Sequence, residues 1–236
     1  MEHGQVMSPG IPAFGFTSTR MQSALSTVAR GTAFEQRSLL LLQECFSMSL
    51  RRVGGKSDGG VDLLGWWWLP FSESQSTPST PSTLSRRRIR VLAQCKAEKK
   101  KFSPNYVREM EGVWHMHARS HSSSELGTVA LLLSESAFTT ATLTRALGSS
   151  VPFLLMHLPP PSSPLSVCPD ALGEVGSAFW NPALGGTCGL LRGELDIRWE
   201  RDVSGGGRPG LWCRDKRVQS WTPDHTQVEY LGAVDQ

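Results

Sequence analysis

The chain has 236 residues, of which 39% are hydrophobic and 19% are charged. That composition is typical of a globular protein and excludes a wholly disordered chain, and the length suffices for one domain with extensions. The net charge of +3 is only mildly basic, so the overall balance does not by itself indicate a nucleic-acid partner. No apolar run approaches the roughly 18 residues that span a bilayer, so we expect no membrane-spanning helix.

The first thirty residues contain Arg20 and Arg30, one acid, Glu2, and many serines and threonines. This composition is typical of a mitochondrial transit segment, although a generic disordered N-terminus has a similar one. We therefore predict that residues 1–30 are a transit or disordered segment. Five cysteines without a Cys-x-x-Cys pair argue against a disulfide framework or a structural zinc site, and they fit a reducing compartment.

The next segment predicts a helix and a strand. Apolar residues at helical spacing predict a helix over residues 33–51, which the glycines at 54 and 55 end. Glu35 then lies in the first helical turn, where a glutamate is most often a favourable charge at the positive end of the helix. Residues 61–69 predict a strand whose three tryptophans alternate between its faces, with Trp67 opposite its two neighbours.

A low-complexity loop rich in Ser, Thr and Pro is expected over residues 70–85. After it the pattern predicts strands over 89–96, 127–134 and 151–158 and helices over 106–117 and 137–147. Strand, helix and strand in that order imply parallel crossovers. The sequence therefore predicts an α/β fold with a central mixed β-sheet that is flanked by helices.

The chain changes character after the prolines at 159–164. Residues 195–200 alternate as a half-buried strand, and residues 211–221 predict a hairpin. We therefore predict a core domain over 31–158 and a C-terminal β-rich extension over 159–236. Asp196 and Glu200 are best explained as a solvated strand face.

Candidate chemistry is concentrated on two predicted neighbouring strands. Asp62 begins one of them, after Gly59-Gly60-Val61, and Gln94-Cys95-Lys96 ends the other. A divalent cation at a nucleic-acid backbone needs hard oxygen ligands and a nearby cationic group. Asp62 would supply one oxygen, the Gln94 side chain or the Cys95 backbone carbonyl a second, and Lys96 the cation. Gln94 and Lys96 should share one strand face, with Cys95 turned to the other.

Basic residues surround this strand. Between residues 86 and 101 there are eight, against the single acid Glu98. The residues predicted to contact nucleic acid are Arg86, Arg87, Arg88, Lys99, Lys100 and Lys101. A solvated loop and helix entry is the other explanation for the same charges.

The segments at 31–35 and 58–62, with Gln94-Cys95-Lys96, resemble the Mrr-type branch of the restriction-endonuclease-like superfamily, the PD-(D/E)xK nucleases. Within that superfamily the chain is similar to the fungal mitochondrial family "required for respiratory growth protein 7". The resemblance covers about residues 31–158. It implies catalytic roles for Glu35, Asp62, Gln94 and Lys96, where Gln94 occupies a position that is acidic in many members of the superfamily.

The resemblance implies a restriction-endonuclease-like core, Mg²⁺ or Mn²⁺ as cofactor, DNA as partner, hydrolysis of phosphodiester bonds and a mitochondrial location. It points to a role in mitochondrial genome maintenance or respiratory growth. A catalytically weak or inactive nucleic-acid-binding module on the same fold is the alternative. A third class is a structural partner of mitochondrial complexes that acts through its tail. Substrate preference, DNA versus RNA and oligomeric state do not follow from the sequence.

Overall fold

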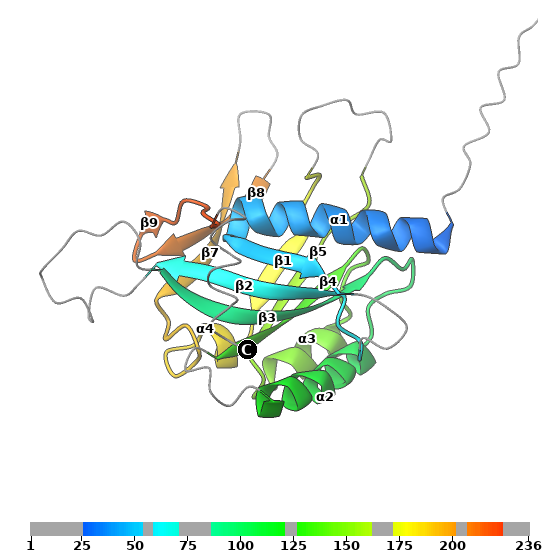
Figure 1. The fold of residues 1–236 in the computed structure, drawn as a ribbon, viewed down its shortest axis with the longest axis horizontal. Coiled ribbons are helices and arrows are strands. Elements are labelled where there is room, and N and C mark those ends of the chain that lie inside the picture. The colour runs from blue at the N-terminus through cyan, green and yellow to red at the C-terminus, as the bar shows by residue number, and fades with distance from the viewer. Residues whose placement is uncertain are drawn as a thin grey trace, which may run out of the picture.

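The computed structural model describes residues 26–53, 59–70, 86–120, 127–161, 172–201 and 207–223. Nearly all of the predicted transit segment, the glycines at 54 and 55, Asp58 and residues 71–85 of the predicted loop lie outside them, whereas Pro70, predicted to begin that loop, is the last residue of a strand. The described chain forms a six-stranded mixed sheet with helices on both faces, and a separate three-stranded sheet (Figure 1). The predicted α/β class with a central mixed sheet is confirmed.

The elements in chain order are α1 (Thr27–Phe46), β1 (Met48–Arg52), β2 (Leu63–Pro70), β3 (Arg86–Lys96), α2 (Pro104–Ser120), β4 (Thr128–Ser134), α3 (Thr140–Leu147), β5 (Phe153–His157), β6 (Ser177–Trp180), α4 (Pro182–Gly185), β7 (Leu195–Arg201), β8 (Gly207–Cys213) and β9 (Lys216–Arg217). The main sheet has the strand order β1-β2-β3-β4-β5-β6. Strands β1 to β3 pair antiparallel, β3 to β5 pair parallel, and β6 pairs antiparallel with β5. The predicted parallel crossovers are thus confirmed.

The sheet separates two hydrophobic cores. All seven residues of β4 are buried, as expected for a continuous apolar run covered on both faces. Along β3, Val91 and Ala93 lie in the core on the α1 side, whereas Leu92 lies in the core that α2 and α3 cover. Figure 1 shows α1 on one side of the sheet and α2 with α3 on the other. Successive side chains of a strand point to opposite faces, so this alternation fixes the side on which each candidate residue lies.

The first helix begins six residues earlier and ends five residues earlier than predicted, so Glu35 does not lie in its first turn as expected. Ser26 caps its start by accepting a hydrogen bond from the Ala29 amide, and Ser47 ends it in the left-handed conformation with φ of 58°. Residues 48–51, predicted as the last helical turn, instead belong to β1 and pair with β2. The prediction was wrong there because Met48 and Leu50 fit both a helical stripe and the alternating face of a strand, and pairing with β2 decides between them.

The main sheet continues past residue 158. β6 extends it beyond β5, and Leu172, Leu184 and Leu195 are buried in the α1-side core. The last three strands form their own antiparallel sheet, in which β8 and β9 make a hairpin within the predicted range 211–221. Its turn is Arg214-Asp215 and its second strand is residues 216–217, whereas residues 214–217 were expected to form the turn and 218–221 the second strand. The C-terminal part therefore packs on the same core as the predicted domain.

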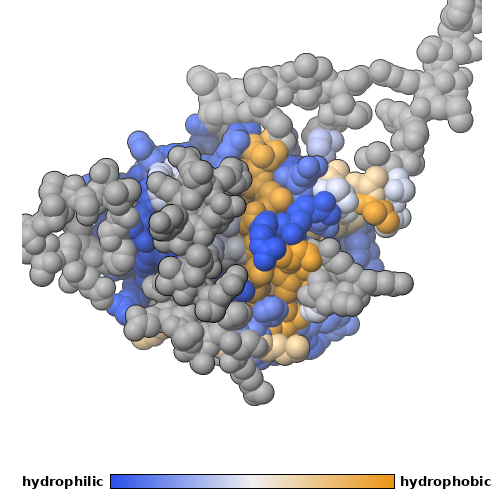
Figure 2. Space-filling view, in the orientation of Figure 1, coloured by the Kyte–Doolittle hydropathy of each residue, from blue (hydrophilic) through white to orange (hydrophobic). Residues whose placement is uncertain are grey.

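One view of the surface shows hydrophobic residues in a strip near α1 and β1, with hydrophilic residues on both sides (Figure 2). Leu40 of α1 contributes to the exposed apolar surface, with 45% of its area accessible. In the part of the chain that the structure describes, none of the helices has the length and hydrophobicity needed to cross a membrane.

Candidate functional site

Asp62 lies at the edge of the sheet, one residue before β2. Its backbone amide donates to the Ala93 carbonyl at 2.9 Å, which continues the pairing between β2 and β3. Its carboxylate Oδ2 accepts a hydrogen bond from the backbone amide of Cys95 at 2.6 Å. The carboxylate thus takes the place of a strand acceptor and is fixed beside the last residues of β3. Gly59 and Gly60 turn the chain into this position with φ of 62° and 89°, a region that favours glycine.

Gln94 is directly beside this edge, on the side of the sheet that α2 covers. Its side chain is buried, with 5% exposure, and its Oε1 has no hydrogen-bond partner among the described residues. The Nε2 atom lies close to Gly60. A side chain in place of this glycine would bring its Cβ to 3.5 Å from Nε2. A buried carbonyl oxygen without a donor is costly, so this atom is the clearest position in the site for a cation or water.

Lys96 lies on the same strand face as Gln94, above an aromatic ring. Its Nζ is 5.0 Å from the ring centroid of Tyr106 in α2, a cation–π distance. The Tyr106 hydroxyl donates to the carboxylate of Glu98, with its oxygen 3.0 and 3.1 Å from the two carboxylate oxygens. Partial burial and this acceptor raise the pKa of the Tyr106 phenol, so it remains a donor at neutral pH. Tyr106 was not among the predicted site residues, and no sequence spacing marked it.

Glu35 lies on the opposite face, where α1 packs. Its carboxylate pairs with the Arg52 guanidinium at 2.6 Å. Cys95 points to this side as well and packs against the α1-side core. Burial raises the pKa of the Cys95 thiol well above its ordinary value, and Asp62 and Glu35 raise it further. The thiol is therefore neutral, and its backbone is the part of Cys95 that faces Asp62.

The structure thus brings Asp62 to Gln94 and Cys95, places Lys96 beyond them on the Gln94 side, and engages Glu35 with Arg52 on the other side. Within the described residues, no group of three His, Cys, Asp or Glu side chains is arranged to hold a metal ion. A metal at this site would depend on one carboxylate together with amide and main-chain oxygens.

The predicted basic cluster is divided. Arg86 and Arg88 lie on the α2 side of β3, whereas Arg87 turns toward the C-terminal sheet, where burial lowers its pKa and Glu194 partly offsets that effect. The exposed lysines follow the other end of β3. At about 3.3 Å per residue, the strand separates Arg86 from Lys96 by roughly 33 Å. The cluster is therefore not one continuous patch.

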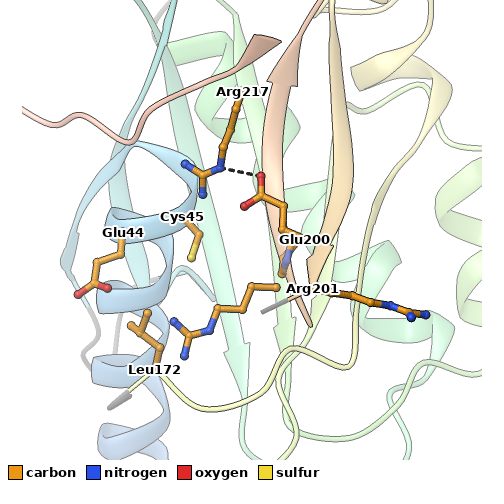
Figure 3. Close-up of a pocket in the computed structure, with 8 residues that line it drawn as sticks. Glu44, Cys45, Leu172, Glu200, Arg201 and Arg217 are labelled. Atoms are coloured by element: carbon orange, nitrogen blue, oxygen red, sulfur yellow. Dashed lines mark hydrogen bonds and ion pairs between the residues drawn. The ribbon is translucent and has the colours of Figure 1, made fainter. Parts of the chain in front are cut away.

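A pocket of about 340 Å³ lies elsewhere, between α1 and the C-terminal sheet (Figure 3). It is lined by Glu44, Cys45, Leu172, Glu200, Arg201, Arg208, Pro209 and Arg217. Glu200 pairs with Arg217 at 2.6 Å, and burial raises the pKa of the Cys45 thiol although Arg208 lowers it. Two glutamates and three arginines line the pocket, and it shares no residue with the Asp62 site. Asp196 is exposed and pairs with Arg198, as expected for a solvated strand face, whereas Glu200, for which the same was predicted, is half-buried beside Arg217.

The fold and the site define an α/β protein with a polar site at one edge of the sheet, where β2 begins and β3 ends. A family model described as "Required for respiratory growth protein 7" matches residues 26–181. The chain belongs to this family.

Several individual proteins are similar in sequence to this chain. An uncharacterized mitochondrial protein of Schizosaccharomyces pombe is 32% identical over 141 residues, which are 60% of this chain and 49% of that protein. "Required for respiratory growth protein 7, mitochondrial" is 28% identical in Saccharomyces cerevisiae strain S288c, over 57% of this chain and 66% of that protein. The Zygosaccharomyces rouxii protein of the same name is 30% identical over 42% and 52% of the two chains.

The chain spans about half to two thirds of the length of these relatives. Their names confirm the mitochondrial location predicted from the sequence. No solved structure matches the chain.

Proposed function

We propose that this protein acts on DNA through a metal-dependent, nuclease-like site of Mrr type, formed by Asp62, Gln94 and Lys96. One observation carries the proposal: the Asp62 carboxylate is fixed 2.6 Å from the Cys95 amide, beside the buried Gln94 oxygen that has no partner among the described residues. A mixed sheet with helices on both faces agrees with the fold that the resemblance implies. The reaction would be hydrolysis of a phosphodiester bond.

The residues fit Mg²⁺ or Mn²⁺. Asp62 and the Gln94 side-chain oxygen would hold the ion, with the Cys95 backbone carbonyl as a third oxygen, because Mg²⁺ is commonly bound by one or two carboxylates together with water and substrate phosphate. When bound, the ion would supply Lewis-acid catalysis and activation of water. The neutral Gln94 gives this site one negative charge less than an acidic residue would, so substrate phosphate would contribute much of the binding.

The chain's own residues would orient the substrate. The ammonium of Lys96, held over the Tyr106 ring, would stabilise charge that develops on the phosphate. Glu98 holds the Tyr106 hydroxyl and so fixes the ring. Glu35 would act at the metal's hydration shell only if it could leave Arg52, and its observed role is that ion pair.

The cellular context is mitochondrial. The Saccharomyces cerevisiae and Zygosaccharomyces rouxii relatives carry respiratory growth in their names, and a protein that maintains mitochondrial DNA would account for such a requirement. We therefore place the proposed activity in mitochondrial genome maintenance.

A nucleic-acid-binding module with weak or absent cleavage is the second candidate. It is favoured by the neutral Gln94, by the pairing of Glu35 with Arg52, and by the lack of a three-acid cluster among the described residues. It differs from the first candidate in requiring binding without turnover.

An assay on supercoiled plasmid DNA distinguishes the two. We expect the purified protein to nick or linearise the plasmid with Mg²⁺ or Mn²⁺ but not with EDTA. Asp62→Asn retains an acceptor for the Cys95 amide and removes the charge, so the rate should fall by about 10²- to 10³-fold with the fold intact. Asp196→Asn, at an exposed acid of β7, should cleave like wild type. Cleavage that survives Asp62→Asn would exclude this site, and binding without cleavage would favour the second candidate.

A further inference from the structure

Beside the site, the α2-side face of β1, β2 and β3 carries a mixed cationic and aromatic surface, which we call the Trp66 face. It consists of Arg51, Leu64, Trp66, Arg88 and Arg90. These residues share one face because Arg51 pairs with Leu64 and Trp66 pairs with Arg90 in the antiparallel register, while Arg88 lies two residues before Arg90. Trp67, the next residue of β2, points to the opposite face and is fully buried in the α1-side core.

The arginines of this face are stacked on the indole. The Arg88 Cζ lies 4.4 Å from the Trp66 ring centroid, and the Arg90 Cζ lies 5.7 Å from it. Guanidinium groups held in this way lose less side-chain entropy when they bind a phosphate, and their planes can also stack on a base. Trp66, Arg88 and Arg90 are each partly exposed.

At the described strand positions, the charged side chains of the Trp66 face are all cationic. Its three cations come from β1 and β3, and the strand positions that face the same way on β1 to β3 include no carboxylate before the sheet edge at Asp62. Arg86, on the same side of β3, donates to the carbonyls of Trp68 and Gln219 and lies over the Trp221 ring, so it is not counted in this face. The surface therefore fits a ligand that is polyanionic and also carries flat rings.

The Trp66 face is also continuous with the candidate site along β2. Trp66 lies four residues after Asp62, or roughly 13 Å at about 3.3 Å per residue. In duplex geometry, successive nucleotides of one strand advance about 3.4 Å along the axis, so a strand on this face would reach Asp62 within a few nucleotides.

We infer that the Trp66 face binds single-stranded nucleic acid and leads it to the Asp62 edge. This inference rests on the proposed function and names its substrate form. Arg88 and Arg90 contact phosphates or stack on bases, with Trp66 holding them in place, and Arg51 adds a phosphate contact. Single-stranded binders combine cationic tracks with aromatic platforms in this manner. Duplex DNA would offer mainly its backbone and would leave the stacked arrangement unused.

Fluorescence anisotropy with a labelled oligo-dT and a duplex of equal length tests this inference. We expect wild type to bind the single strand more tightly. Arg88→Ala with Arg90→Ala should weaken that binding and reduce the magnitude of the salt slope by about 1.4, because each lost phosphate contact on a single strand removes about 0.7. The control Arg201→Ala with Lys216→Ala removes two exposed cations from the C-terminal sheet and should bind like wild type.

The conservative pair Arg88→Lys with Arg90→Lys keeps the charges. It should retain most of the salt slope yet lose about tenfold in affinity, because stacking is lost. Circular dichroism and thermal melting confirm that each variant is folded.

Three outcomes would overturn a claim. If the alanine pair and its control bind alike while wild type binds DNA, the Trp66 face is excluded and the proposed function stands. Tighter binding of the duplex than of the single strand would exclude the substrate form. If wild type neither binds nor cleaves any nucleic acid, the proposed function itself fails.

Discussion

Replacing Lys96 with alanine is expected to reduce the rate of DNA cleavage by about 10²- to 10³-fold, the usual loss when one preorganised group that stabilises developing charge is removed. The ammonium lies over the Tyr106 ring, on the same strand face as Gln94, so its position is fixed before substrate arrives. Affinity for duplex DNA should change much less, with the salt slope altered by about 0.9 if one phosphate contact is lost. Single-turnover rates and anisotropy measure the two effects separately.

Lys99→Ala is the matched control for this prediction. It removes the same charge from an exposed lysine three residues further along the chain. We expect it to affect binding and its salt dependence, with the single-turnover rate at saturating protein retained. Equal loss of cleavage in the two variants would show that Lys96 acts as a general phosphate contact and not as the catalytic cation.

Replacing Asn181 with alanine should lower the free energy of unfolding by about 3 to 5 kcal/mol. The side chain is 1% exposed, and the two N–H groups of its Nδ2 are shared among the carbonyls of Ala146, Ser149 and Val151, which lie 2.8 to 3.0 Å away. Its Oδ1 accepts from the amides of Phe153 and Leu184. Alanine would leave several of these buried backbone groups without a partner, at the junction of α3, β5 and α4.

Thermal and urea unfolding measure this effect. A loss of 3 to 5 kcal/mol corresponds to about 10 °C in Tm for a chain of this size. Asn105→Ala, at an exposed asparagine that accepts one hydrogen bond from Arg108, should change stability by less than about 1 kcal/mol. If the two variants are equally stable, Asn181 does not hold these elements together.

The sequence predicted the central strands well because their signals are local. A run of apolar residues over 127–134 specifies a strand covered on both faces, and every residue of β4 is buried. In contrast, β1 and β6 depend on partners that are distant in sequence. Met48–Arg52 completes a helical stripe equally well, and Ser177–Trp180 is four residues long with no apolar alternation. Both segments are strands because they pair with β2 and β5.

The candidate residues show the same division. Alternation along a strand correctly separated Cys95 from Gln94, and the same rule would have separated Arg87 from Arg86 and Arg88 had it been applied to the basic cluster. Tyr106 and Arg52 could not be found in this way. Their contacts with Lys96 and Glu35 join different elements, and only the packing of α2 and the existence of β1 bring them together.

The dependence of the cleavage rate on Mn²⁺ concentration tests the central claim most directly, because it reports the ligands of the metal through the reaction itself. We predict saturable activation in wild type, and in Asp62→Asn a half-saturating Mn²⁺ concentration at least about tenfold higher, together with the lower maximal rate. Asp196→Asn should follow the wild-type curve. A curve for Asp62→Asn that coincides with wild type, or cleavage that proceeds equally in EDTA, would contradict a metal site at Asp62 and Gln94.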